Sequence, residues 1–140
     1  MRTNSRIVAV SAGLILAVAP LRAHHAFSAE FDAAKPVTLV GAITKMQWIN
    51  PHAWLYIDVT EPDGKVETWG IEAGSPNVLL RRGFNKDMLQ LGTVIKVRGF
   101  LAKDGSHKAN GGDMTLPNGK TLLLGSSGTG APDPEDEKKK

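Results

Sequence analysis

The stretch "WLYIDVTEPDGKVETWGI", from Trp54 to Ile71, decides the fold. Leu55, Ile57 and Val59 alternate with polar or aromatic residues, which is the two-residue period of a half-buried strand. The sequence "EPDGK" then supplies the Pro-Asp-Gly of a tight turn, and "VETWGI" returns as a second strand. The stretch therefore predicts a β-hairpin whose three aliphatic side chains point into the core.

The segments that flank this hairpin predict further strands and one helix. Before it, Val37 to Trp48 is a long β-rich run in which Gly41 suggests a bend or a bulge. After it, Ser75 can cap a short helix through "PNVLLRRG", and Thr93–Leu101 and Lys120–Leu124 are predicted as strands. This order predicts an all-β fold, a small five-stranded OB-like barrel with one short helix between strands 3 and 4. A sandwich with a crossover helix is the alternative.

The first residues have the pattern of a targeting segment. Arg2 and Arg6 precede an uncharged run of small and apolar residues from Ile7 to Ala19, as in a secretory signal peptide. At about 1.5 Å per residue, this run is too short to cross the ~30 Å hydrocarbon core of a bilayer. We predict that residues 1–23 are a signal peptide cleaved after Ala23. The mature chain would then begin at His24 in the periplasm and have no membrane anchor.

Composition divides the mature chain into three parts. We predict an N-terminal arm over residues 24–36, an OB-like β domain over residues 37–124, and a flexible linker with a disordered charged tail over residues 125–140. The sequence contains no cysteine, so no disulfide stabilises this small domain and its core must suffice.

The basic balance of the chain comes from the predicted signal peptide. The sequence holds 17 Lys and Arg against 14 Asp and Glu, and Arg2, Arg6 and Arg22 precede the expected cleavage site. The mature chain therefore has a formal net charge of zero. Binding to nucleic acid requires clustered basic residues that displace counterions from phosphates, so the sequence argues against a nucleic-acid partner.

The sequence contains none of the common catalytic patterns. It has no cysteine nucleophile, no G-x-S-x-G elbow, no phosphate-binding G-x-x-x-x-G-K loop and no H-E-x-x-H zinc helix. Asp58, Glu67 and Glu72 lie on or beside the predicted hairpin, where carboxylates on the solvated face of a small barrel are ordinary. We therefore expect a protein that is not an enzyme.

The histidines predict a metal site. If cleavage exposes His24, its free amine and its imidazole can chelate one metal ion, and nitrogen donors in tetragonal geometry favour Cu(II). His25 and His52 are the further candidate donors, and His107 and Met114 are weaker ones. The alternative is that the histidine pair is a solvated start of the chain and that His52 bonds only to the backbone of its own turn.

A metal-free binding module is the competing function. An OB-like barrel offers a concave face to a small ligand or a partner protein, and Trp48, Tyr56 and Trp69 would supply its stacking surface. These aromatic side chains can equally well serve as core and rim packing. A structural envelope protein without any small ligand is a third hypothesis.

Four segments of the chain together resemble a known family. These are "HHAFSAEFD", "KPVTLVGAITKMQWINPHAWLYIDV", "ETWGIEAGSPNVLLRRGF" and "GTVIKVRGFLAKDGS", which cover roughly His24 to Leu124. They are similar to the exported bacterial proteins of domain-of-unknown-function family 6152. The resemblance implies an exported single-domain protein, and it implies no activity or catalytic residue.

Overall fold

The computed structural model describes residues 26–125. The predicted signal peptide, His24, His25 and the charged tail lie outside this range. In chain order the elements are α1 (Ala26–Glu30), β1 (Phe31–Gln47), β2 (Trp54–Thr60), β3 (Val66–Glu72), α2 (Pro76–Arg81), the 3₁₀ turn η2 (Lys86–Met88), β4 (Val94–Ala102), β5 (Lys108–Thr115) and β6 (Thr121–Leu123).

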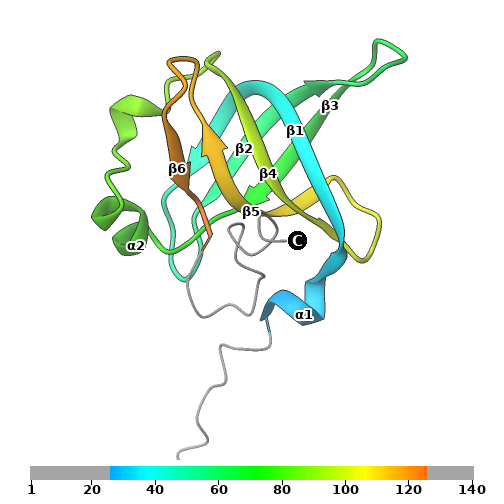
Figure 1. The fold of residues 1–140 in the computed structure, drawn as a ribbon, viewed down its shortest axis with the longest axis horizontal. Coiled ribbons are helices and arrows are strands. Elements are labelled where there is room, and N and C mark those ends of the chain that lie inside the picture. The colour runs from blue at the N-terminus through cyan, green and yellow to red at the C-terminus, as the bar shows by residue number, and fades with distance from the viewer. Residues whose placement is uncertain (1–25, 126–140) are drawn as a thin grey trace, which may run out of the picture.

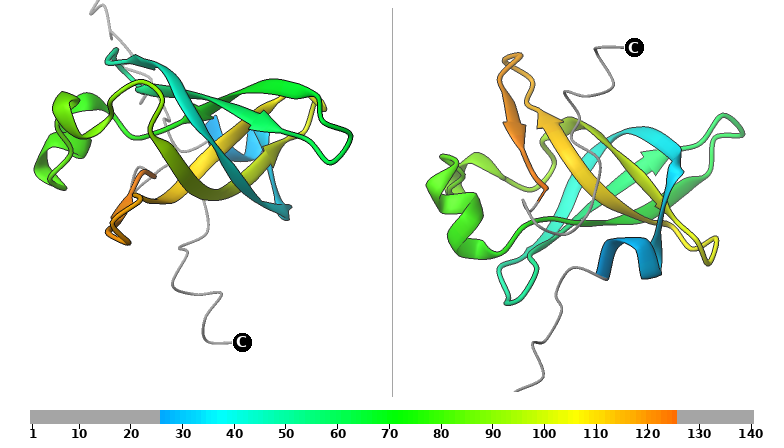
Figure 2. Two further views of the ribbon diagram at one scale, coloured as in Figure 1. Left: turned by 90° about the horizontal axis from the view of Figure 1, so that it is seen from above. Right: turned by 60° about the horizontal axis from the view of Figure 1, so that its bottom comes forward.

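The described part of the chain is mostly β, with all six strands in one sheet (Figure 1). The strand order is β3-β2-β1-β4-β5-β6, and sequential neighbours in this order are antiparallel. An additional parallel pairing joins β3, at one end of this order, to β5, so that the hydrogen bonding of β3, β2, β1, β4 and β5 runs in a closed ring with β6 outside it. The view from above shows how the strands cross and wrap around one another (Figure 2).

The β2–β3 hairpin has the predicted faces and the predicted turn. Leu55 and Ile57 are fully buried and Val59 is nearly so, in one core cluster with residues from all six strands. The turn closes with hydrogen bonds from Glu61 N–H to the Lys65 carbonyl (2.8 Å) and from Gly64 N–H to the Glu61 carbonyl (2.9 Å). The alternation of apolar residues was therefore sufficient to assign the inner face of this hairpin.

β1 is long enough to take part in both halves of the ring. Its first half pairs with β4 and its second half with β2, and Gly41 pairs with both strands. A Cβ atom at Gly41 would lie 2.4 Å from the carbonyl oxygen of Asp58, so only glycine permits this close backbone contact. The register shift between β1 and β2 lies between Ile43 and Lys45, beyond the glycine where a bend or bulge was expected.

The short helix lies between β3 and β4, as expected, but the strand count differs from the prediction. Ser75 caps α2 by accepting a hydrogen bond from Val78 N–H (3.4 Å), and Pro76 is its first residue. Six strands are present instead of five, because residues 108–115 form β5. The Asn110-Gly111-Gly112 sequence in this strand has low β propensity, and pairing with β3, β4 and β6 holds it extended.

α1 packs on the outside of the sheet through a small second core. Phe27 stacks on Phe31 with ring centroids 5.9 Å apart and meets Phe100 edge-on at 5.6 Å. The backbone N–H of Lys103 donates to the carbonyl of Glu30 (2.8 Å), and Lys103 Nζ donates to the carbonyl of Ser28 (2.6 Å). The start of the described chain is therefore fastened to the β4–β5 hairpin, apart from α2, which lies at one end of the molecule (Figure 2).

We predict that Leu55→Ala lowers the free energy of unfolding by about 2 to 5 kcal/mol, because it empties a fully buried site in a packed core. Tyr56→Ala, one residue along on the outer face, should cost less, since its ring is only partly buried. Chemical denaturation of both variants measures the difference. The reverse order would contradict the assignment of the two faces of β2.

Candidate functional site

His52 lies in the loop between β1 and β2, and the structure holds this loop against the end of β3. The N–H of Ala53 donates to the carbonyl of Gly74 (3.1 Å), and the carbonyl of Ala53 accepts from the N–H of Ala73 (2.9 Å). These two bonds continue the hairpin pairing beyond its last strand residues. They place His52 beside Glu72, the last residue of β3.

His52, Glu72 and Asn110 form a polar line across the outer face of the sheet. His52 Nδ1 is hydrogen-bonded to Glu72 Oε1, and Asn110 provides a side-chain hydrogen bond to the same carboxylate. The parallel register of β3 and β5 places Glu72 opposite Asn110. The Glu72 and Asn110 side chains are buried, whereas the His52 ring is 25% exposed. The imidazole is therefore the member of this line that solvent or a ligand can reach.

Burial raises the pKa of the Glu72 carboxyl above its ordinary value. His52 acts in the opposite direction, Glu30 raises the pKa further, and the hydrogen bond from Asn110 lowers it. A buried carboxylate without partners would be costly, and the two neighbours reduce that cost. The influence of Glu30 also indicates that the end of α1 lies near this carboxylate.

The arrangement around His52 is typical of a histidine prepared to bind a metal. A metal-ligating histidine donates its second ring N–H to a carboxylate or carbonyl, which fixes the tautomer and the orientation of the ring. With Nδ1 bonded to Glu72, the nitrogen that remains for a ligand is Nε2. Asn110 in turn holds the carboxylate, although its Oδ1 has no hydrogen-bond partner within residues 26–125.

The other predicted metal ligands do not join His52 in the described part of the chain. His107 lies in the β4–β5 hairpin, where its ring stacks on Trp69 with centroids 4.9 Å apart and its Nδ1 lies 3.4 Å from Glu67 Oε2. Met114 is fully buried in the main core. Within residues 26–125, no group of three histidine, aspartate or glutamate side chains is close enough to hold a metal ion. His24 and His25 lie outside the described residues.

The three aromatic residues predicted as a ligand face do not share one surface. Trp69 is buried in the main core, and its Nε1 has no hydrogen-bond partner among the described residues. Trp48 packs against the same core while remaining partly exposed. Tyr56 lies on the outer face, where its hydroxyl donates to Gln47 Oε1 (3.0 Å).

Sequence reasoning misjudged Glu72 and missed Asn110. Glu72 was expected on the solvated face, like Asp58 and Glu67, but it is buried because the His52 loop and β5 cover it. The strand alternation places the Glu72 side chain on the outer face, and it does not indicate that the His52 loop and β5 cover this part of the face. Asn110 lies in an Asn-Gly-Gly sequence that is typical of a turn, so no local signal placed it in a strand beside a carboxylate.

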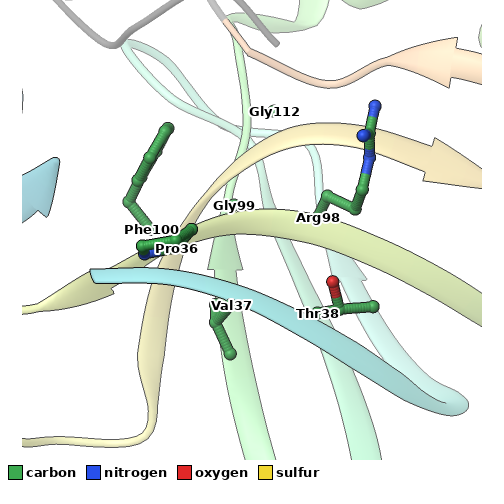
Figure 3. Close-up of a pocket in the computed structure, with 7 residues that line it drawn as sticks. All are labelled: Pro36, Val37, Thr38, Arg98, Gly99, Phe100 and Gly112. Carbon is green, nitrogen blue, oxygen red and sulfur yellow. The ribbon is translucent and has the colours of Figure 1, made fainter. Parts of the chain in front are cut away.

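A small hollow of about 60 Å³ lies where β1 and β4 run side by side (Figure 3). Arg98 and Phe100 extend from the same side of β4 there, and Arg98 forms an ion pair with the buried carboxylate of Asp113 (Figure 3). The rest of its lining consists of Pro36, Val37, Thr38, Gly99 and Gly112. This hollow is too small for more than a few water molecules. A larger groove lies on the outer face of β2 and β3.

Comparison with known proteins places the sequence in a family. The model described as "Family of unknown function (DUF6152)" matches residues 12–111 of the 140. Among curated proteins, no sequence matches the chain. In residues 26–125, no helix is both long enough and apolar enough to span a membrane.

We predict that the free energy of unfolding of the Glu72→Gln variant increases, relative to that of the unchanged chain, as the pH rises. The folded-state pKa of Glu72 is raised, so its contribution to stability is complete when the carboxyl is protonated and is lost as the pH rises through that pKa. Glutamine removes this loss. The measurement is urea denaturation of both chains at about pH 4 and pH 8 in the presence of a chelator.

Glu67→Gln, at a partly exposed carboxylate of the same strand, is the matched control. A difference between Glu72→Gln and the unchanged chain that stays constant over this pH range would contradict the raised pKa.

Proposed function

The chain belongs to the DUF6152 family of unknown function, and from its own geometry we propose that it is an exported periplasmic protein that binds Cu(II). The donors in this proposal are the terminal amine and imidazole of His24 and the Nε2 atom of His52. The observation that carries it is the hydrogen bond between His52 Nδ1 and the buried Glu72, which fixes the ring with its other nitrogen free for a metal.

The position of α1 supports a contribution from the N-terminal histidines. Glu30 affects the pKa of Glu72, so the end of α1 lies near the pair that holds His52. His24 is six residues before Glu30, and a chain of that length reaches at most about 20 Å even when extended. His25 is a further donor in the same reach. The length of the chain between His24 and Glu30 therefore permits His24 and His52 to share one ion.

The choice of copper rests on the type of donor. An amine and imidazoles are nitrogen ligands, and tetragonal nitrogen sites favour Cu(II), which also binds most tightly among the divalent first-row ions. His107 and Met114 have no part in this site, because His107 stacks on Trp69 and Met114 is enclosed in the core. The proposed role is metal binding and not catalysis.

Export is part of the proposal because it creates the chelate. Before cleavage, the nitrogen of His24 is a peptide nitrogen without an amine's basicity. Cleavage after Ala23 makes it a terminal amine beside its own imidazole. Copper capture would then be confined to the compartment that the signal peptide reaches.

We predict that protein purified from its native host begins at His24. Mass spectrometry of the intact chain measures the N-terminus directly. A chain that still begins at Met1, or one cleaved at another residue, would contradict both the export and the chelate parts of the proposal.

Loss of a residue that only hydrogen-bonds to a metal ligand lowers metal affinity by about 10- to 100-fold. We predict that His52→Ala lowers the affinity of the mature chain for Cu(II) by more than this, because His52 is proposed as a ligand itself. One additional residue before His24 should weaken binding as well, because it converts the terminal amine into a peptide nitrogen. Calorimetric copper titration of the three chains is the measurement. Binding should also weaken below about pH 6, since both the imidazole and the amine must lose a proton to coordinate.

His107→Ala is the matched control for His52→Ala, because the Nδ1 atom of each histidine lies beside a glutamate carboxylate. Its copper affinity should equal that of the unchanged chain. Equal affinity in the His52→Ala, extended and unchanged chains would overturn the copper proposal. The metal-free alternative, a binding module on an OB-like barrel for a small ligand or partner protein, would then be the better hypothesis.

A further inference from the structure

A groove on the outer face of β2 and β3 is large enough for a small ligand. Its volume is about 320 Å³, at the lower end of the ~300 to 1,000 Å³ usual for small-molecule sites. Its lining consists of Trp54, Tyr56, Thr68, Gly70, His107 and Lys108, and we call it the Gly70 groove.

The floor and two of the walls follow from strand geometry. Leu55 and Ile57 point into the core, so Trp54 and Tyr56 both point outward, two residues apart on β2. Gly70 is the residue opposite Tyr56 on β3. A Cβ atom at Gly70 would lie 3.5 Å from Tyr56 Cε1 and 3.7 Å from Trp54 Cε3. Gly70 itself is buried, so the absence of a side chain there lets the two rings lie close together over the strand.

The Tyr56 ring is held in place before any ligand arrives. Its hydroxyl donates to Gln47 Oε1 (3.0 Å), and Lys45 Nζ lies over the ring, 5.3 Å from its centroid. Both partners belong to β1, the neighbouring strand. On the other side of the groove, His107 is fixed by its stacking on Trp69. A ligand would therefore lose little binding energy to the ordering of these side chains.

The rim of the groove carries hydrogen-bonding groups of several kinds. The Thr68 hydroxyl donates to Asp58 Oδ1 (2.6 Å), which leaves its oxygen as an acceptor. The His107 imidazole can donate or accept, and the Lys108 ammonium donates. Lys108 is the only Lys, Arg, Asp or Glu in this lining, and the hollow that shares Lys108 with it is lined by Glu30 and Asp104 as well as Lys103. Charges of both signs along the two hollows do not select one sign of charge, and together with the hydroxyl and the imidazole they suit a neutral ligand that has many hydroxyl groups.

A second hollow shares Lys108 with the Gly70 groove. It also has a volume of about 320 Å³, lies between α1 and the β4–β5 hairpin, and includes Lys108 and Lys103 in its lining. Lys108 therefore stands between two adjacent hollows. A ligand with several linked rings can occupy both, whereas a single small ring would fill only one.

From these observations we propose that the Gly70 groove binds a neutral oligosaccharide. One hexopyranose ring would lie with its apolar face against Trp54 and Tyr56, because an aromatic ring presents a flat apolar surface that matches the C–H face of a sugar. Its hydroxyl groups would bond to Thr68, His107 and Lys108, and the next ring would extend past Lys108 into the second hollow. This site needs no metal and is independent of the copper proposal.

The test uses the mature chain in the presence of a chelator, with three probes followed by calorimetry and by amide chemical shifts. The probes are cellotetraose, with β-linked glucose, maltotetraose, with α-linked glucose, and p-hydroxybenzoate, a flat anion without sugar hydroxyls. We expect one of the tetrasaccharides to bind and to shift the amide signals of Thr68 and Lys108. Trp54→Ala should weaken this binding by at least about tenfold.

Gly70→Leu and Gly70→Ala form the decisive pair. The leucine side chain would push the two rings apart, which removes the flat surface they form, and should abolish saccharide binding. The alanine methyl group would make only ordinary contacts and should leave binding within about threefold. Thermal unfolding and copper titration of the leucine variant verify that the fold and the His52 site are intact.

Three outcomes would overturn the saccharide proposal. These are no binding of either tetrasaccharide by the unchanged chain, equal binding by a folded Gly70→Leu chain, and binding of p-hydroxybenzoate alone. None of these results bears on copper binding at His52, which the titrations of the His52 variant test separately.

Discussion

The parallel pairing of β3 with β5 is the constraint on which the rest of the structure depends. It closes the hydrogen-bonded ring by joining Gly70–Glu72 to Lys108–Asn110. β5 must therefore approach β4 and β3 at once, and the register of β4 and β5 shifts between Arg98 and Gly99 where it does so. A Cβ atom at Gly99 would lie 2.1 Å from the carbonyl oxygen of Asn110. Glycine at this position is what allows the two backbones to come so close.

Both proposed binding regions lie on the outer side of this junction. Glu72 lies opposite Asn110 in the parallel register, and this pair holds His52. Gly70 lies opposite Lys108 in the same register, and these two residues line the groove. Trp54 pairs with Glu72 across β2 and β3, so the groove and the histidine loop are neighbours. One set of backbone hydrogen bonds therefore positions the side chains of two sites.

The polar line at this junction is costly for stability. Burial disfavours the ionised form of Glu72, and Asn110 Oδ1 has no hydrogen-bond partner in the part of the chain that the structure describes. An apolar pair at these two positions would avoid both costs. Buried polar groups that weaken a fold are expected where they orient a functional side chain, and here they orient His52, the ligand in the copper proposal.

The sequence by itself determined the local elements, and the proposal of export rests on the sequence alone. The two-residue alternation around Ile57, the turn at Glu61–Lys65 and the Ser75 cap each involve residues close together in the chain. The tertiary structure alone decided that residues 108–115 form a strand, that Glu72 is buried and that Trp54 lines a groove together with Lys108. These outcomes depend on the pairing of β5 with β3. Glu72 and Asn110, which are partners in this pairing, are more than thirty residues apart in the chain. A local pattern records which face of a strand a residue occupies, and it contains no information about which distant segment will cover that face.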